Sequence, residues 1–216
     1  MSAPKFKELR RVYGFDEVAI VPGRITLNPD MATTEMSVGN VNLDIPIMAS
    51  AMDAVVSPSF ANLMHKKGGL GVLNLEGIYA RYEDPFSALE EIASAPLTEV
   101  TGLLQRIYSE PVKESLVGAI VEEIKMSGAT CAVSVTPQNT KRISPQAVEA
   151  GADVLVVQST VTTARHISRS YKGLVFKELV DQTPIPVMVG NCVGYDTALE
   201  LMETGISGLL VGVGPG

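Results

Sequence analysis

The stretch Ala150-Gly151-Ala152-Asp153-Val154-Leu155-Val156-Val157-Gln158 (AGADVLVVQ) joins the end of one predicted element to the start of the next. Gly151 follows an amphipathic segment, and glycine at such a site takes the left-handed conformation that commonly ends a helix. The apolar run that comes directly after it has the length and the β-branched composition of a buried strand. The stretch therefore predicts a helix that turns straight into a strand of a parallel sheet.

The same arrangement recurs at irregular intervals, at Lys67-Gly68-Gly69, Ser127-Gly128-Ala129 and Thr204-Gly205-Ile206. Short runs rich in Val, Ile and Leu are typical of strands that are buried on both faces. They predict strands at Ile45–Ala51, Gly71–Leu75, Thr130–Val135, Asp153–Gln158, Pro186–Gly190 and Gly208–Gly212. Helices are predicted at Pro58–Lys67, Pro85–Ala93, Pro111–Ser127, Thr140–Ala150, Leu174–Gln182 and Tyr195–Thr204. This alternation favours an α/β fold of the (β/α)8 TIM-barrel type, with a doubly wound open sheet as the second choice.

Six strands are recognisable, whereas a closed barrel needs eight. Two interpretations are open at this point: an open six-stranded sheet, or about the first six strands of a longer barrel. We expect residues 1–216 to form a single catalytic barrel domain that is incomplete at its C-terminus, with two sheet edges exposed if it is expressed alone. The irregular stretches Val21–Asp44 and Ser94–Leu103 are predicted to be loops.

Composition and charge limit the partners that the chain can have. Its 216 residues are 46% hydrophobic, which is enough for a sizeable core, and a net charge of −7 argues against binding to nucleic acid or to an anionic membrane. No stretch has the length of a signal-peptide core or of a membrane span, so we expect a cytoplasmic protein. Cys131 and Cys192 lack the spacing of a metal site and are predicted to be reduced, buried thiols.

Polar side chains follow most of the predicted strands, at the ends that form the functional face of a barrel. They are Ser50 and Asp53, Asn74, Ser134 and Thr136, Gln158 and Ser159, and Asn191. Uncharged hydrogen-bonding groups that converge on one rim suit a small polar ligand such as a base or a ribose. The competing interpretation is that strand ends need polar caps for structural reasons alone.

Two segments at this face are more specific. In Ala49-Ser50-Ala51-Met52-Asp53, small side chains let the backbone approach a ligand, and Met52 can lie across a flat ring; tight packing in a turn is the alternative. In Gly212-Val213-Gly214-Pro215-Gly216, glycines free the backbone and proline prevents a helix from starting. Such a loop can direct N–H groups at an anion or C=O groups at a cation.

Taken together, these motifs resemble those of the inosine monophosphate dehydrogenase / guanosine monophosphate reductase family, a group of (β/α)8 barrels. The resemblance spans nearly the whole chain and rests on segments in the family's order: Tyr13–Pro22, Ile45–Asp53, Gly68–Gly71, Gly190–Val193 and Val211–Gly216. The segment from Leu75 to Thr130 is too short to contain the tandem regulatory (CBS) domains that many members insert there. The chain is therefore most similar to the compact branch that lacks them.

The resemblance implies roles for individual residues. It implies that the purine nucleotide is bound by Ser50, Met52, Asn191, Gly212 and Gly214. It implies cofactor contacts for Asp53, Gln158, Ser159 and Thr160. It also implies that Gly214 and Gly216 offer backbone carbonyls to a monovalent cation, K⁺, and that the nucleophilic cysteine of the family's GxGPGSxC motif would follow Gly216, outside this sequence.

Two positions depart from the family's pattern. Gln158-Ser159-Thr160 stands where the family has an aspartate that contacts the nicotinamide ribose, so a charge-assisted hydrogen bond becomes a neutral one. Leu210 stands where many members carry Lys or Arg beside the nucleotide. Both changes bear on how cofactor and substrate are held.

The activity that the resemblance implies is NAD-dependent oxidation of inosine 5'-monophosphate (IMP) to xanthosine 5'-monophosphate (XMP) through a covalent cysteine adduct, in guanine nucleotide biosynthesis. Two alternatives stay open. One is NADPH-dependent reduction of guanosine monophosphate (GMP), and the other is a purine-nucleotide-binding regulatory barrel without catalysis. The resemblance also implies a homotetramer or octamer.

Overall fold

The computed structural model describes residues 11, 13–14, 16–167 and 173–213, and the chain divides into two compact units. The first unit comprises residues 1–33 with 214–216, and its described part contains one short 3-10 helix, η1 (Pro29–Met31). The second unit, residues 34–213, contains the sheet and its helices. The residues that line the candidate hollow all belong to the second unit.

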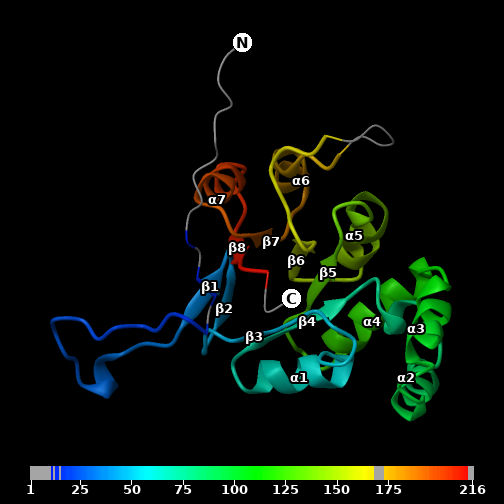
Figure 1. Ribbon diagram of the computed structural model, residues 1–216. Helices are drawn as coiled ribbons and strands as arrows, with labels where there is room; N and C mark the ends of the chain where they lie inside the picture. Colours follow the sequence, from blue (N-terminus) through cyan, green and yellow to red (C-terminus); the bar gives the residue numbers. More distant parts are fainter. Residues whose placement is uncertain (1–10, 12, 15, 168–172, 214–216) are drawn as a thin grey trace. The chain divides into compact units, whose positions relative to one another are not determined.

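Six parallel strands form one sheet in which every strand pairs with the next one along the chain. They are β3 (Met48–Ala49), β4 (Leu70–Asn74), β5 (Ala132–Val135), β6 (Val154–Gln158), β7 (Val187–Cys192) and β8 (Gly208–Val211). A doubly wound sheet reverses its strand order at a switch point, and this sheet does not. Figure 1 shows the strands curling in an arc with helices on the outside. The second unit is thus a six-stranded half-barrel, which confirms the prediction of a barrel-type α/β fold.

Seven α-helices are present in the described residues. Five of them pack outside the strands: α1 (Pro58–Lys66), α4 (Glu114–Met126), α5 (Thr140–Glu149), α6 (Phe176–Gln182) and α7 (Tyr195–Met202). The connection from β4 to β5 additionally contains η2 (Ile78–Ala80), α2 (Pro85–Ser94) and α3 (Val100–Ser109). All six predicted helices are confirmed within a few residues. The loop predicted at 94–103 is wrong in part, because α3 begins at Val100.

Glycines end the helices as the opening stretch predicts. Gly68, Gly128, Gly151 and Gly205 have φ angles of 83°, 78°, 100° and 88°, each directly before the return into the sheet. Helix starts are capped by side chains in two cases. Ser57 accepts from the backbone N–H of Phe60 at 3.1 Å, and Asp84 accepts from that of Ser87 at 3.2 Å. Local chemistry therefore sets where the repeated units begin and end.

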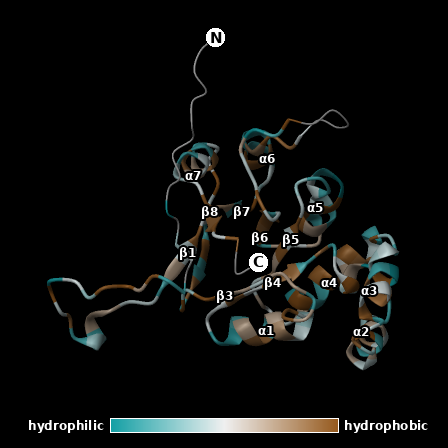
Figure 2. Ribbon diagram, viewed as in Figure 1, coloured by the Kyte–Doolittle hydropathy of each residue, from teal (hydrophilic) through white to brown (hydrophobic). Residues whose placement is uncertain are grey.

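Alternate residues along each strand face opposite sides of the sheet, and both sides are apolar. The outer side packs on the helices around Leu73, Val133 and Leu155. The concave inner side carries a second cluster that includes Leu70, Val72, Ala132, Val154, Val156 and Met188. Figure 2 shows hydrophobic residues along the strands and hydrophilic ones on the outer turns of the helices.

A hairpin that the sequence analysis missed packs against the inner cluster. Strands β1 (Met36–Val38) and β2 (Val41–Leu43) pair antiparallel within the stretch that was predicted to be a loop. Val38 and Leu43 are 2% and 4% exposed and belong to the inner cluster. The turn residue Gly39 has a φ of 58°, and an added Cβ would lie 2.5 Å from Pro186, just before β7. The hairpin therefore packs at the amino ends of the strands.

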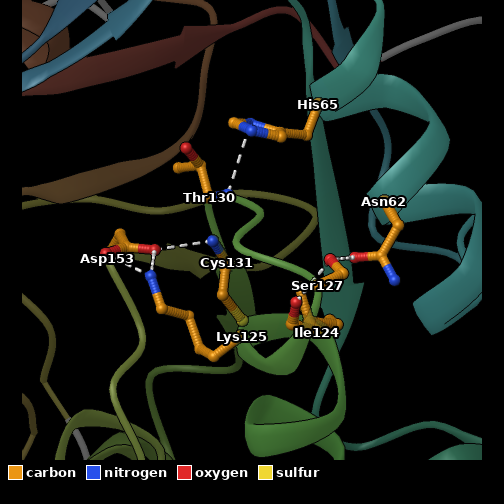
Figure 3. A network of polar contacts seen from close by, with 8 residues as sticks. All are labelled: Asn62, His65, Ile124, Lys125, Ser127, Thr130, Cys131 and Asp153. Carbon is orange, nitrogen blue, oxygen red and sulfur yellow. Dashed lines mark hydrogen bonds and ion pairs between the residues drawn. The ribbon is translucent and has the colours of Figure 1, made fainter.

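Polar groups at the amino ends of the strands are linked to one another (Figure 3). Asp153 accepts from Lys125 Nζ at 2.7 Å and from the backbone N–H of Cys131 at 2.7 Å. His65 of α1 accepts through Nδ1 from the backbone N–H of Thr130 at 3.3 Å. These contacts join α1 and α4 to the starts of β5 and β6. Among the described residues, no helix is both long and apolar enough to span a membrane.

Candidate functional site

A hollow of about 310 Å³ opens at the carboxyl ends of β3, β6, β7 and β8. Its apolar walls come from the inner face of the sheet, with Met48, Val72, Val156 and Leu210 among the lining residues. Small-molecule sites commonly measure about 300–1,000 Å³ and combine apolar walls with a few polar groups. The hollow therefore has the size and the lining needed to receive a flat ring.

Three of the predicted site residues meet at this hollow, although they lie far apart in the sequence. Ser50 follows β3, Gln158 ends β6 and Asn191 belongs to β7, and all three line the hollow. Within the described part of the chain, the Ser50 hydroxyl and the Gln158 amide have no hydrogen-bond partner. These two groups are therefore available to a ligand without breaking a contact inside the protein.

The Asn191 side chain already makes one hydrogen bond, which ties β7 to the loop after β8. Its Nδ2 donates to the carbonyl of Gly212 at 2.8 Å, and the Gly212 N–H donates to the carbonyl of Cys192 at 2.8 Å. Gly212 has a φ of 99°, a conformation that favours glycine. Asn191 thus positions this loop and keeps its amide oxygen for another donor. Gly214 and Gly216, predicted to bind the cation, lie outside the described residues.

Leu210 gives the hollow an apolar floor. It is paired with Gly190 in the β7–β8 register, and a Cβ added at Gly190 would lie 2.4 Å from the Leu210 Cβ. Glycine at position 190 therefore lets the Leu210 side chain lie over the neighbouring strand. A ligand in the hollow would contact a hydrocarbon surface at this position.

The other residues predicted after β6 are placed differently. Ser159 Oγ donates to the carbonyl of Val161 at 2.9 Å and contacts Thr162 Oγ1 at 3.0 Å. Thr162, which is 4% exposed, donates to the carbonyl of Gly190 through its hydroxyl at 2.6 Å. Ser159 therefore holds its own loop against β7, whereas Thr160 is exposed. The cofactor contacts predicted for Ser159 and Thr160 stay predictions.

Met52 and Asp53 lie in the loop after β3 but do not line the hollow. The Met52 side chain is 53% exposed. Asp53 Oδ2 accepts from the backbone N–H of Ile78 at 2.9 Å and from the hydroxyl of Tyr108 at 2.5 Å. Two donors of the protein thus already engage the carboxylate that was predicted to contact the cofactor. That contact stays a prediction, and the observed bonds give Asp53 a part in holding its loop.

The segment just after β4 links the loops of the two neighbouring strands, which the sequence analysis did not foresee. Glu76 accepts from the backbone N–H of Thr136, after β5, at 2.5 Å, and from the side chain of Asn139. Ile78 donates to Asp53, after β3. The sequence signal for this link is Glu76 followed by Gly77, just after the strand. Position 77 requires glycine, because a Cβ there would lie 1.8 Å from Asp53 Oδ1.

Neither cysteine of the chain is placed to act as a nucleophile. Cys192 is 1% exposed and packs in the cluster between the sheet and the helices. Cys131 is fully buried at the opposite end of the sheet, where burial and the nearby Asp153 carboxylate raise the pKa of its thiol to about 12. A thiol must ionise to attack, so Cys131 is inert near neutral pH. Both observations confirm the prediction of buried thiols.

Comparison with known proteins shows what this chain is similar to. Residues 12–216 match the model of the IMP dehydrogenase / GMP reductase domain. Uncharacterized oxidoreductases of Mycolicibacterium smegmatis and Mycobacterium tuberculosis are 36% and 37% identical to it over 210 and 211 residues, which is 95% of this chain and 56% of each relative. The inosine-5'-monophosphate dehydrogenase of Cryptosporidium parvum is 27% identical, over 97% of this chain and 53% of that protein.

A solved structure agrees with these matches. The IMP dehydrogenase/GMP reductase-like protein of Corynebacterium glutamicum superimposes with a TM-score of 0.88 and 33% sequence identity, covering 96% of this chain and 56% of that one. The chain thus spans about half the length of the curated relatives that it matches. On the match of the domain model and the shared half-barrel, the chain belongs to the IMP dehydrogenase / GMP reductase family.

Proposed function

We propose that the hollow at the carboxyl ends of the strands binds the base of a purine nucleoside monophosphate, and that the full-length protein exchanges a hydride at C2 of that base. The reaction that we put first is oxidation of IMP: C2 gives a hydride to NAD and takes an oxygen from water, and the products are XMP, NADH and a proton. The observation that carries this proposal is the meeting of Ser50, Gln158 and Asn191 at one apolar hollow.

The chemistry of the hollow supports a neutral heterocycle as its occupant. A purine has two apolar faces and an edge of hydrogen-bonding groups, which match an apolar floor and a polar rim. The Ser50 hydroxyl can donate or accept, and the amide oxygen of Asn191 can accept. In this binding mode the residues of the chain hold and orient the base.

The residues present fit a nicotinamide cofactor in part. Gln158 lines the hollow with a free amide, which can bind a ribose hydroxyl, whereas the Asp53 carboxylate is engaged by Ile78 and Tyr108. When bound, NAD would supply the hydride acceptor. The other proposed cofactor, K⁺, would be held by Gly214 and Gly216.

A second candidate is the reverse type of chemistry, in which GMP takes a hydride from NADPH and releases ammonia to give IMP. The residues of this chain do not separate this reaction from the oxidation of IMP, because both reactions use the same base and the same hollow. The neutral Gln158 and the apolar Leu210 favour a third candidate, a barrel that binds nucleotide without turnover, because both depart from the pattern that the family resemblance implies. The three candidates share the same hollow and differ in what happens at C2.

The experiment uses the full-length protein and measures binding before turnover. Calorimetric titration with IMP and with GMP should give saturable binding. Ser50→Ala should raise the Kd roughly ten- to a hundred-fold, because it leaves a polar group of the ligand without a hydrogen-bond partner, which costs about 1–3 kcal/mol. Ser115→Ala on the exposed side of α4 is the matched control, and it should bind like the unaltered protein. Asn191→Ala should weaken binding and also loosen the β8 loop, because it removes the bond to Gly212.

Turnover then separates the candidates. NADH formation from IMP and NAD supports the dehydrogenase, and NADPH consumption with GMP supports the reductase. Binding of both nucleotides with neither reaction supports a regulatory barrel. If neither nucleotide binds, or if Ser115→Ala weakens binding as much as Ser50→Ala does, the hollow is not the nucleotide site.

A further inference from the structure

The loop between β3 and α1 carries Ser50 to the rim of the hollow, so its position decides whether that hydroxyl meets a ligand. The loop makes three tight turns of its own: the Met52 N–H donates to the carbonyl of Ser50 at 2.8 Å, and the N–H groups of Val55 and Val56 donate to the carbonyl of Met52 at 2.9 Å. Val56, at 1% exposed, anchors the far end in the core. Between Ser50 and Val56, the described residues form one hydrogen-bonded side-chain link to the rest of the unit, through Asp53, and Ala51 packs against the inner cluster.

The Asp53 carboxylate connects this loop to the segment inserted between β4 and α4. One of its oxygens, Oδ2, accepts from the Ile78 N–H and the Tyr108 hydroxyl, at 2.9 and 2.5 Å. The other oxygen, Oδ1, is buried and has no partner among the described residues. The Ile78 bond is a backbone contact at η2, directly after the strand. The Tyr108 bond reaches across from α3, which is 55 residues away in the sequence.

The Tyr108 hydroxyl can donate its hydrogen bond to Asp53 over a wide pH range. Its pKa is raised by burial and by the hydrogen bond and negative charge of Asp53, so the phenol keeps its proton well into alkaline solution. The guanidinium of Arg81 lies 5.7 Å from the centre of the Tyr108 ring. Arg81 in turn donates to the carbonyl of Glu76 at 3.0 Å and to that of Glu110, so the ring is held between α3 and the end of β4.

We propose that Tyr108 is a positioning residue: its hydroxyl fixes Asp53, and through Asp53 it holds the β3–α1 loop so that Ser50 stays at the rim of the hollow. The effect on nucleotide binding rests on the proposed function, whereas the effect on the loop does not. The inserted segment that carries α2 and α3 thereby acquires a role at the site, since Tyr108 of α3 bonds Asp53, and Asp53 belongs to the loop that carries Ser50.

The test compares two tyrosines of the inserted segment. Tyr108→Phe keeps the ring and removes the hydroxyl that bonds Asp53. Tyr82→Phe is the matched control, because the Tyr82 hydroxyl donates to the carbonyl of Ile107 at 3.0 Å within the same segment and does not contact the loop. Both substitutions remove one tyrosine hydroxyl bond, so a purely structural role would give the two variants the same behaviour.

Two measurements on the full-length protein decide the matter. In nucleotide-free protein, amide hydrogen exchange over residues 50–56 should be about tenfold faster in Tyr108→Phe and unchanged in Tyr82→Phe. In calorimetric titration, the Kd for IMP or GMP should rise by about three- to tenfold in Tyr108→Phe, with Tyr82→Phe like the unaltered protein. In a background of Asp53→Ala, the effect of Tyr108→Phe on exchange should shrink, because the acceptor of the Tyr108 hydroxyl is already absent.

The outcomes are distinguishable. Equal exchange over residues 50–56 in both tyrosine variants overturns the inference, even if nucleotide binds. Faster exchange in Tyr108→Phe with no nucleotide bound by the unaltered protein supports the inference and contradicts the proposed function. If Tyr108→Phe does not fold, Asp53→Ala alone is measured in the same way, and unchanged loop exchange in that variant overturns the inference.

Discussion

Replacing Asp153 with alanine should destabilise the protein far more than the loss of an ordinary surface ion pair. Asp153 lies before β6, and its carboxylate accepts from Lys125 Nζ at 2.7 and 3.0 Å and from the Cys131 N–H at 2.7 Å (Figure 3). The side chains of Asp153 and Lys125 are 31% and 35% exposed. The carboxylate thus joins α4, β5 and β6 at a partly sheltered point.

The magnitude follows from these contacts. A hydrogen bond to a charged group contributes about 1.5–3 kcal/mol, and the buried Cys131 N–H would be left without its acceptor. The ion pair with Lys125 is partly screened by solvent and adds at most about 1 kcal/mol. We expect Asp153→Ala to lower the free energy of unfolding by about 2–3 kcal/mol. Asp153→Asn should lower it by about 1 kcal/mol, because an amide oxygen can still accept from Cys131.

Thermal unfolding of the full-length protein measures this difference. For a domain of this size, 1 kcal/mol shifts Tm by about 2–4 °C, so Asp153→Ala should lower Tm by about 4–12 °C. The control is Asp181→Ala, which breaks an exposed pair with Lys177 within α6 and should cost under about 2 °C. Equal shifts for the two alanine variants would refute the reasoning. A shift for Asp153→Asn as large as that for Asp153→Ala would refute the role of the Cys131 N–H.

Four further predictions concern glycines, a thiol, assembly and potassium. Gly77→Ala should displace Asp53 and lower Tm, because the added Cβ would lie 1.8 Å from the carboxylate. Gly102→Ala in α3 is the control: its Cβ would meet nothing within 4 Å, so the substitution should stabilise the helix by about 1 kcal/mol. Thermal unfolding measures both variants. The pKa of the Cys131 thiol is raised to about 12, so its contribution to folding stability is fully present below pH 9 and is lost as the pH rises from 9 towards 12. Because the buried thiol stays protonated near neutral pH, alkylation at pH 8 followed by mass spectrometry should find Cys131 unmodified until denaturant is added. Light scattering of the full-length protein should give at least a tetramer, and potassium should raise the rate of turnover; a monomer at micromolar concentration would count against the proposed assembly.

Local patterns were sufficient to predict the half-barrel. A glycine that must adopt positive φ, followed by a short β-branched run, depends on a few adjacent residues, and all four such glycines have that conformation. Strand β3 is shorter than predicted, at Met48–Ala49, because pairing with β4 joins only Met48 to Leu70 and Ala49 to Gly71. Length along the chain therefore overestimates a strand when a neighbour limits its pairing.

The missed elements lack such local signals. Strands β1 and β2 have three residues each, so they form through the pairing itself and through burial of Val38 and Leu43. Helix α3 begins after Glu99, which makes no capping bond with its side chain, and it packs partly against α2 rather than against the sheet. Its existence depends on a partner helix that no short window of sequence reveals.

The same distinction explains which parts of the candidate site were predictable. Ser50, Gln158 and Asn191 come directly after or at the end of predicted strands, and parallel strands bring their carboxyl ends together whatever lies between them. Tyr108 meets Asp53 through packing of an inserted segment, and Glu76 meets Thr136 across 60 residues of sequence. Periodicity does not specify such pairs.

The polar groups at the amino ends of the strands have hydrogen-bond partners within the protein, whereas two at the carboxyl ends have none among the described residues. We therefore expect the amino ends to contribute to stability and the carboxyl ends to ligand binding. At the amino ends, the Asp153 carboxylate is bonded on both oxygens and His65 accepts from Thr130, so little hydrogen-bonding capacity is left for a ligand. At the carboxyl ends, Ser50 and Gln158 have no partner in the described part of the chain, although both lie beside an apolar hollow. Substitutions at the amino ends should therefore change Tm and leave Kd unaltered, while Ser50→Ala should change Kd and leave Tm unaltered. Asn191 contributes to both stability and binding, since its Nδ2 holds Gly212 while its amide oxygen remains free for a ligand. Asn191→Ala should therefore lower Tm and raise Kd at once.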